Sequence, residues 1–142
     1  MKVILCLVST FLFLAAVIAQ TVHIRYPVAG TRIRIGRSFT AQIVKPNAVV
    51  GCTEVAIVLA IASCNNGVCP QPANHLGTVL YNGPFNPELH EIPGNPYQNF
   101  TMKVPQNLSP GPAIFTFTHL CLRGAGPSPL LEYGEQSITT IA

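Results

Sequence analysis

The sequence has 142 residues, a length that suits one domain. Charged residues make up 9% of the chain and the formal net charge is +3, which is too weakly basic to indicate nucleic acid as a partner. The chain has no aspartate and no Gly-x-Ser-x-Gly motif, so the usual Ser-His-Asp arrangement of a hydrolase lacks its acid.

Residues 1–19 have the pattern of a secretory signal peptide. A lysine precedes a long apolar run, and Val17 and Ala19 occupy the minus-three and minus-one places of a small-residue cleavage site. The alternative is a membrane anchor, but the run is short for a bilayer crossing, which takes about 20 residues. We expect cleavage before Gln20 and release of residues 20–142 as a single secreted domain without membrane attachment.

The remainder of the chain predicts short strands separated by turns. Prolines and glycines recur throughout, and no stretch between them keeps the apolar spacing of a helix. The apolar run at 54–62 is compatible with a buried helix, but its β-branched residues favour a strand buried on both faces. In chain order, the predicted strands are 22–26, 31–35, 38–44, 54–62, 76–81, 98–104, 113–122 and 130–141.

This spacing predicts an all-β fold, an immunoglobulin- or fibronectin-like sandwich of two sheets and about seven strands. Alternation within the strand at 113–122 places Phe115, Phe117 and His119 on one face. The proline-rich stretch at 85–96 is expected to be a long ordered loop.

Four cysteines remain after removal of the signal peptide, and an even number in an exported chain predicts two disulfides. Three pairings are possible. Cys64 and Cys69 enclose a turn-rich tetrapeptide, which favours a local bond between them and leaves Cys52 for Cys121. The longer crosslink would stabilise the fold by about 4 kcal/mol in the chain-entropy model. A zinc site fits poorly, because the Cys-x4-Cys spacing has no matching second pair.

Few residues could carry out catalysis. Glu88 and Glu91 could form the acid and base pair of a glycosidase, and His90 between them could sense pH or bind a metal weakly. Solvated loop charges are the alternative. We expect no catalytic residues, no cofactor and no bound metal, and therefore a protein that is not an enzyme.

Aromatic residues gather among prolines in two segments and form a candidate interface, because rigid aromatic side chains lose little entropy on binding. These residues are Tyr81, Phe85, Tyr97 and Phe100. The alternative is that their rings fill the ends of the sandwich.

Two arginines and two sequons are further candidate sites. Arg32 and Arg34 share one strand face, where they could bind an acidic partner or keep an edge strand from aggregating. Asn99 and Asn107 each begin an Asn-x-Ser/Thr sequon and are candidate glycosylation sites in a secreted chain, with lower use expected at Asn107 because Pro110 follows its sequon.

Several segments resemble small secreted proteins of fungi. They are residues 38–43, 54–58, 76–84 and 97–101, with Gly124-Ala125-Gly126-Pro127 before the last strand. Together they resemble the family of the fungal necrosis-inducing secreted protein, an effector, over nearly the whole mature chain. The shared pattern consists of strands and turns and contains no catalytic motif.

The resemblance implies a non-enzymatic effector that blunts plant pattern-triggered immunity by binding receptor-associated immune kinases, and that can cause cell death in leaves. The sequence leaves open whether the protein stays outside cells or enters host cells. An extracellular module bound to glycan or to the producer's own wall is an alternative, based on fold analogy. A small hydrolase using Glu88, Glu91 or His90 is a third.

Overall fold

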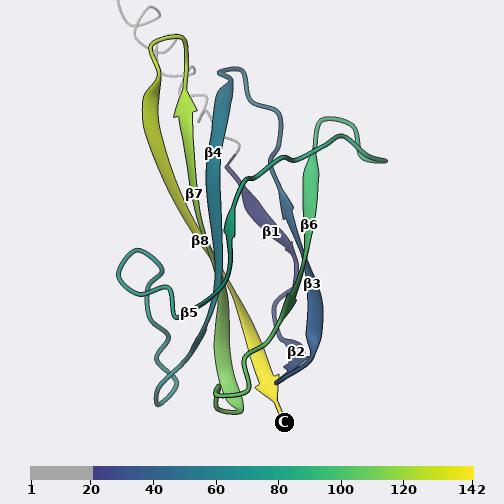
Figure 1. Ribbon diagram of the computed structural model, residues 1–142, viewed down its shortest axis with the longest axis vertical. Coiled ribbons are helices and arrows are strands. Elements are labelled where there is room, and N and C mark those ends of the chain that lie inside the picture. Colours follow the sequence, from purple (N-terminus) through teal and green to yellow (C-terminus); the bar gives the residue numbers. More distant parts are fainter. Residues whose placement is uncertain (1–20) are drawn as a thin grey trace, which may run out of the picture.

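The computed structural model describes residues 21–142, which fold into two facing β-sheets without a helix (Figure 1). The strands are β1 (His23–Tyr26), β2 (Thr31–Arg34), β3 (Ser38–Val44), β4 (Cys52–Ser63), β5 (Thr78–Gly83), β6 (Tyr97–Lys103), β7 (Gly111–Arg123) and β8 (Ser128–Ile141). The predicted two-sheet sandwich is confirmed, with eight strands in place of about seven. The signal peptide expected at 1–19 and the start at Gln20 lie outside the described residues.

Three long strands, β4, β7 and β8, form the middle of the larger sheet. The smaller sheet has the order β1-β3-β6, and the larger has the order β2-β8-β7-β4-β5. Strands β4, β7 and β8 are antiparallel neighbours along most of their 12, 13 and 14 residues, and they run along the long axis of the molecule (Figure 1). In the described chain, no helix has the length and apolar character needed to cross a membrane.

The core lies between the sheets and follows from strand alternation. On the larger sheet, Ile57, Leu59 and Ile61 of β4 pair with His119, Phe117 and Phe115 of β7, so these side chains share the inner face. On the smaller sheet, Ala41 of β3 pairs with Phe100 of β6, and both side chains belong to the core.

The aromatic residues predicted to form an interface lie mostly inside the protein, which corrects that prediction. Phe85, Phe100 and Tyr97 are 1%, 5% and 8% exposed. Tyr81 packs on Phe100 with ring centroids 4.8 Å apart and donates its hydroxyl hydrogen to the Pro84 carbonyl at 2.8 Å. Burial of one such ring contributes about 2 to 3 kcal/mol, so the rings fill the space between the sheets, as the alternative interpretation held.

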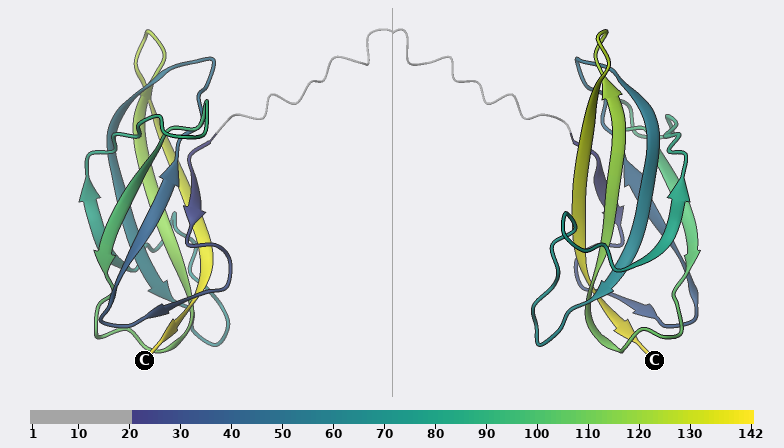
Figure 2. Two further views of the ribbon diagram at one scale, coloured as in Figure 1. Left: turned by 90° about the vertical axis from the view of Figure 1, so that its right-hand side faces the viewer. Right: turned by 60° about the vertical axis from the view of Figure 1, so that its left-hand side comes forward.

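The outer face of the larger sheet is covered over part of its length. Segment 64–77 leaves β4, loops outward and returns to β5 (Figure 2). A β-carbon added at Gly77 would lie 2.6 Å from the β-carbon of Ala62, and the Thr116 hydroxyl donates to the Leu76 carbonyl at 3.4 Å. This cover explains why the outward residues Ala60 and Thr116 are fully buried. The predicted burial of 54–62 on both faces therefore holds for its second half.

Gly134 of β8 offers a test of core packing. A β-carbon there would overlap the Phe117 ring, with its Cζ only 2.6 Å away. We expect Gly134→Ala to lower the free energy of unfolding by about 3 kcal/mol, because the buried ring has no room to move. Gly126→Ala, where no atom lies within 4 Å of the added carbon, is the matched control. Equal urea midpoints for the two variants would refute this packing argument.

Candidate functional site

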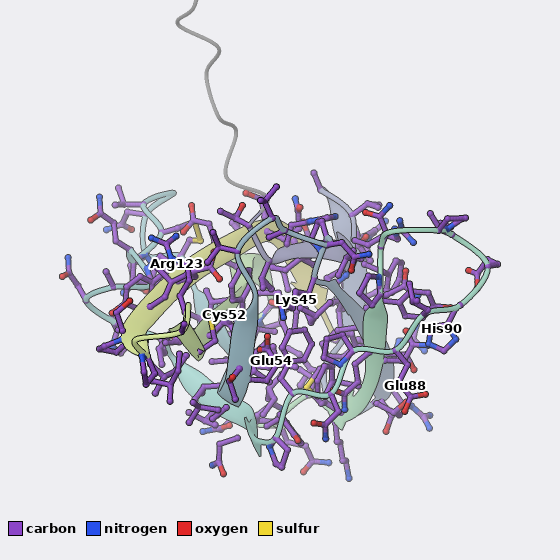
Figure 3. All side chains as sticks on the ribbon, turned by 90° about the horizontal axis from the view of Figure 1, so that it is seen from above. Lys45, Cys52, Glu54, Glu88, His90 and Arg123 are labelled. Carbon is purple, nitrogen blue, oxygen red and sulfur yellow. A yellow bond between two sulfur atoms is a disulfide. The ribbon has the colours of Figure 1, made fainter. Side chains whose placement is uncertain are left out.

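A cavity of about 1090 Å³ opens at the end of the sandwich where β4 begins and β7 ends. Its lining includes the apolar side chains Val22, Phe85 and Leu130 and the rim residues Glu88 and Arg123. Viewed from above, Lys45, Cys52 and Glu54 lie together near the middle of this end, with Arg123 on one side and Glu88 on the other (Figure 3).

Four ionisable side chains form a continuous network in this cavity. His119 of β7 has no exposed surface, and its Nδ1 lies 2.8 Å from Glu132 Oε2 of β8. Its Nε2 is hydrogen bonded to Glu54 Oε2 of β4, and Glu54 Oε1 forms an ion pair with Lys45 Nζ. We call these four residues the ionic cluster.

An irregularity in β4 brings Glu54 into this cluster. Counting back from Ile57 on the inner face, strict alternation would place Glu54 on the outer face. The pairing of β4 with β7 shifts register between Glu54 and Ala56. The extra residue, Val55, is 45% exposed. Because a bulge adds one residue to a strand, it turns both Glu54 and Cys52 inward.

Hydrogen bonding outweighs burial in setting the charges of the cluster. Burial lowers the pKa of His119, but hydrogen bonds to Glu54 and Glu132 raise it above its ordinary value. Burial raises the pKa of Glu54, but hydrogen bonds to His119 and Lys45 bring it below its ordinary value. The favoured state is thus an imidazolium that donates to two carboxylates, with an ammonium beside one of them. Both ring nitrogens of His119 are already engaged.

The structure contains the disulfides Cys52–Cys121 and Cys64–Cys69, with Cα atoms 5.8 Å and 4.1 Å apart. This is the pairing predicted from the turn-rich tetrapeptide between Cys64 and Cys69. Cys121 lines the cavity beside the ionic cluster, and its sulfur lies within 4.8 Å of ligand atoms of Glu54 and His119. While it is bonded to Cys52, this sulfur is not a thiolate.

The loop residues considered for catalysis lie on the surface instead of together in the cavity. The hydroxyl of Tyr97 donates to Glu91 at 3.1 Å and 3.3 Å, and the His90 ring stacks on Tyr97 at 4.1 Å. The backbone of Glu88 exchanges two hydrogen bonds with that of Tyr97, at 3.1 Å and 2.9 Å. Glu88, His90 and Glu91 are all exposed. These contacts anchor the loop to β6, and the two carboxylates do not face a common cavity as a glycosidase pair would.

The remaining sequence candidates are exposed. Arg32 and Arg34 lie on β2 at the edge of the larger sheet, where either proposed role is compatible with their position. Asn99 lies on β6 and Asn107 in the loop that follows. Glycosylation of both, and the acidic partner of the arginines, stay predictions.

The uncovered half of the larger sheet's outer face carries a group of mostly apolar side chains, with Asn82 of β5 beside Val58 and the exposed Glu135 two residues after Tyr133. Two cross-strand rows make it up: Ala56, Leu120 and Leu131 in one, and Val58, Thr118 and Tyr133 in the other. Leu131 and Tyr133 are 49% and 45% exposed. The Thr118 hydroxyl oxygen is buried without a hydrogen-bond partner among residues 21–142. We call these six residues the outer apolar patch.

The structure thus defines a small disulfide-linked β-sandwich protein. The Nis1 family matches residues 17–139, and the chain belongs to this family. Nis1 is a fungal effector-like family, so the effector resemblance is supported at that level, and the two disulfides and the family are consistent with secretion. A comparison with curated proteins finds no match.

Among solved structures, the chain is similar to the crystal structure of a cellulose-active polysaccharide monooxygenase from M. thermophila. The two share 11% identity with a TM-score of 0.49, over 81% of this chain and 55% of that chain. Likeness at this level assigns no activity. The expectation that the chain is not an enzyme rested on missing motifs, and it is corrected by the geometry of the cavity, where carboxylates and an imidazole converge. The similar structure is that of an enzyme, and its activity is not assigned to this chain.

Proposed function

We propose that this Nis1-family protein is an effector that binds a plant immune-receptor-associated kinase and so suppresses pattern-triggered immunity. Family membership over residues 17–139 carries the proposal, because the match takes in all eight strands except the last two residues of β8. The kinase as partner comes from the resemblance to the fungal necrosis-inducing effector family. Because kinase domains use ATP inside cells, this proposal includes passage of the protein into host cells.

The outer apolar patch is the surface that we assign to the kinase. Its residues are neutral, and its two rows lie on three hydrogen-bonded strands, so little order is lost on binding. An exposed tyrosine such as Tyr133 is typical of a protein interface, and Leu131 adds apolar surface beside it.

The direct test is titration of the mature protein with a purified receptor-associated kinase domain, observed by calorimetry. The expected result is saturable binding in a one-to-one complex. In parallel, insoluble chitin and β-glucan are mixed with the protein and the amount left in solution is measured. Depletion by a glucan without kinase binding would replace the effector proposal with the glycan-associated module.

Exposed tyrosines bear on that second possibility. Stacking on sugars favours aromatic rings in one plane. The exposed tyrosines of the described chain, Tyr26 and Tyr133, lie on β1 and β8 and therefore on different sheets. They cannot form such a row, and the kinase proposal is the one that the surface supports better.

A further inference from the structure

The cavity brings together four side chains of the types that bind zinc. Glu54 and Cys52 come from β4, and His119 and Cys121 come from β7. The ligand atoms of Glu54, His119 and Cys121 all lie within 4.8 Å of one another, and the Cys52 sulfur is bonded to that of Cys121. A tetrahedral zinc ion holds its ligands about 3 to 4 Å apart, so small side-chain movements would suffice.

The surroundings of His119 also match those of a metal ligand. Metal-bound histidines usually donate their second N–H to a carboxylate, which fixes the ring and the tautomer. The Nδ1 of His119 lies 2.8 Å from Glu132 Oε2, and the Nε2 lies on the side of Glu54. Loss of the proton shared with Glu54 would leave Nε2 with a free lone pair on the side of the ring that faces Glu54.

We propose that reduction of the Cys52–Cys121 disulfide creates a Zn²⁺ site made of Cys52, Cys121, His119 and Glu54. A thiol reductant such as glutathione breaks the S–S bond with two electrons and two protons, and is itself oxidised to a disulfide. The two new thiols and His119 then release protons to solvent as the metal binds. The charge of Zn²⁺ balances the two thiolates, and Lys45, paired with Glu54, balances that carboxylate.

The zinc site would replace the Cys52–Cys121 disulfide as the link between β4 and β7. In oxidising surroundings the disulfide joins β4 to β7 at the mouth of the cavity. In a reducing compartment, where disulfides do not persist, the metal would join the same two strands. The inference does not depend on which partner the outer apolar patch binds.

The test uses the double variant Cys64→Ser/Cys69→Ser, in which Cys52–Cys121 is the reducible bond of the described chain. A phosphine reductant opens it, with water supplying the oxygen of the phosphine oxide and the two thiol protons. Zn²⁺ is then titrated against a chromophoric chelator, and Co²⁺ serves as a spectroscopic probe. We expect one Zn²⁺ per chain after reduction, a thiolate-to-cobalt charge-transfer band, and affinity about 100-fold above that of the unreduced protein.

Two controls make the result decisive. Cys52→Ser/Cys121→Ser keeps only the Cys64–Cys69 pair and is expected to lack tight binding. Glu132→Gln leaves the four ligands intact and is expected to weaken Zn²⁺ binding about tenfold through the His119 contact. If reduction unfolds the protein, Zn²⁺ should restore its cooperative thermal transition. Equal affinity in the two cysteine variants, or failure of Zn²⁺ to bind or refold the reduced protein, would overturn the proposal.

Discussion

Replacement of His119 by alanine is expected to lower the free energy of unfolding by about 3 to 5 kcal/mol, because it removes the partner of two partly buried carboxylates. Glu54 would keep Lys45 as a counter-ion, but Glu132 would lose its contact within the ionic cluster. Urea unfolding measures the loss. His75→Ala changes an exposed histidine and is expected to cost less than about 0.5 kcal/mol. A comparable loss in both variants would contradict the assigned role of the cluster.

The loss of unfolding free energy in His119→Ala is also expected to depend on pH. Because the pKa of His119 is raised, its contribution is full below the ordinary value of 6.5 and declines as the pH rises through the raised value. Because the pKa of Glu54 is lowered, its contribution is full above the ordinary value of 4.5 and declines as the pH falls through the lowered value. The stability difference between wild type and His119→Ala should therefore be largest between the two ordinary values, pH 4.5 and pH 6.5. A stability difference that does not change with pH would count against the ion pairs.

Removal of the Cys52–Cys121 crosslink by a double alanine substitution is expected to cost about 4 kcal/mol under oxidising conditions. The bond closes a loop with a sequence separation of 69, whereas Cys64–Cys69 spans only 5. Because the entropy that a crosslink removes from the unfolded chain grows with loop length, loss of Cys64–Cys69 should cost only about 2 kcal/mol. Denaturant unfolding of both double variants gives the comparison, and a larger loss for the short loop would contradict it.

Most strands could be predicted from sequence because runs of alternating or β-branched residues lie between turns that contain glycine or proline. The alternation that placed His119 with Phe115 and Phe117 was also the one signal that a histidine faces the core. The aromatic residues were ambiguous for a physical reason. Tyrosine and phenylalanine suit a core as well as an interface, and only the path of the loop after β5 decides which they join.

The ionic cluster could not be predicted in the same way. Register between β4 and β7 is a property of two strands, so the bulge that turns Glu54 inward left no mark on the alternation of its own segment. Lys45 and Glu132 are 87 residues apart in the sequence. They belong to the same cluster only because the fold brings their segments together. The outer apolar patch was hidden likewise, since it exists only because segment 64–77 covers one half of the sheet and leaves the other half open.

The most direct test of the binding surface is the affinity of the kinase domain for two charge variants. Leu131→Glu adds a carboxylate within the outer apolar patch, and Ser38→Glu adds one at an exposed position on β3 of the other sheet. We predict at least roughly tenfold weaker binding, about 1.4 kcal/mol, for Leu131→Glu, and unchanged binding for Ser38→Glu. Equal affinities for both variants and the wild type, with equal thermal midpoints, would contradict the assignment of this face.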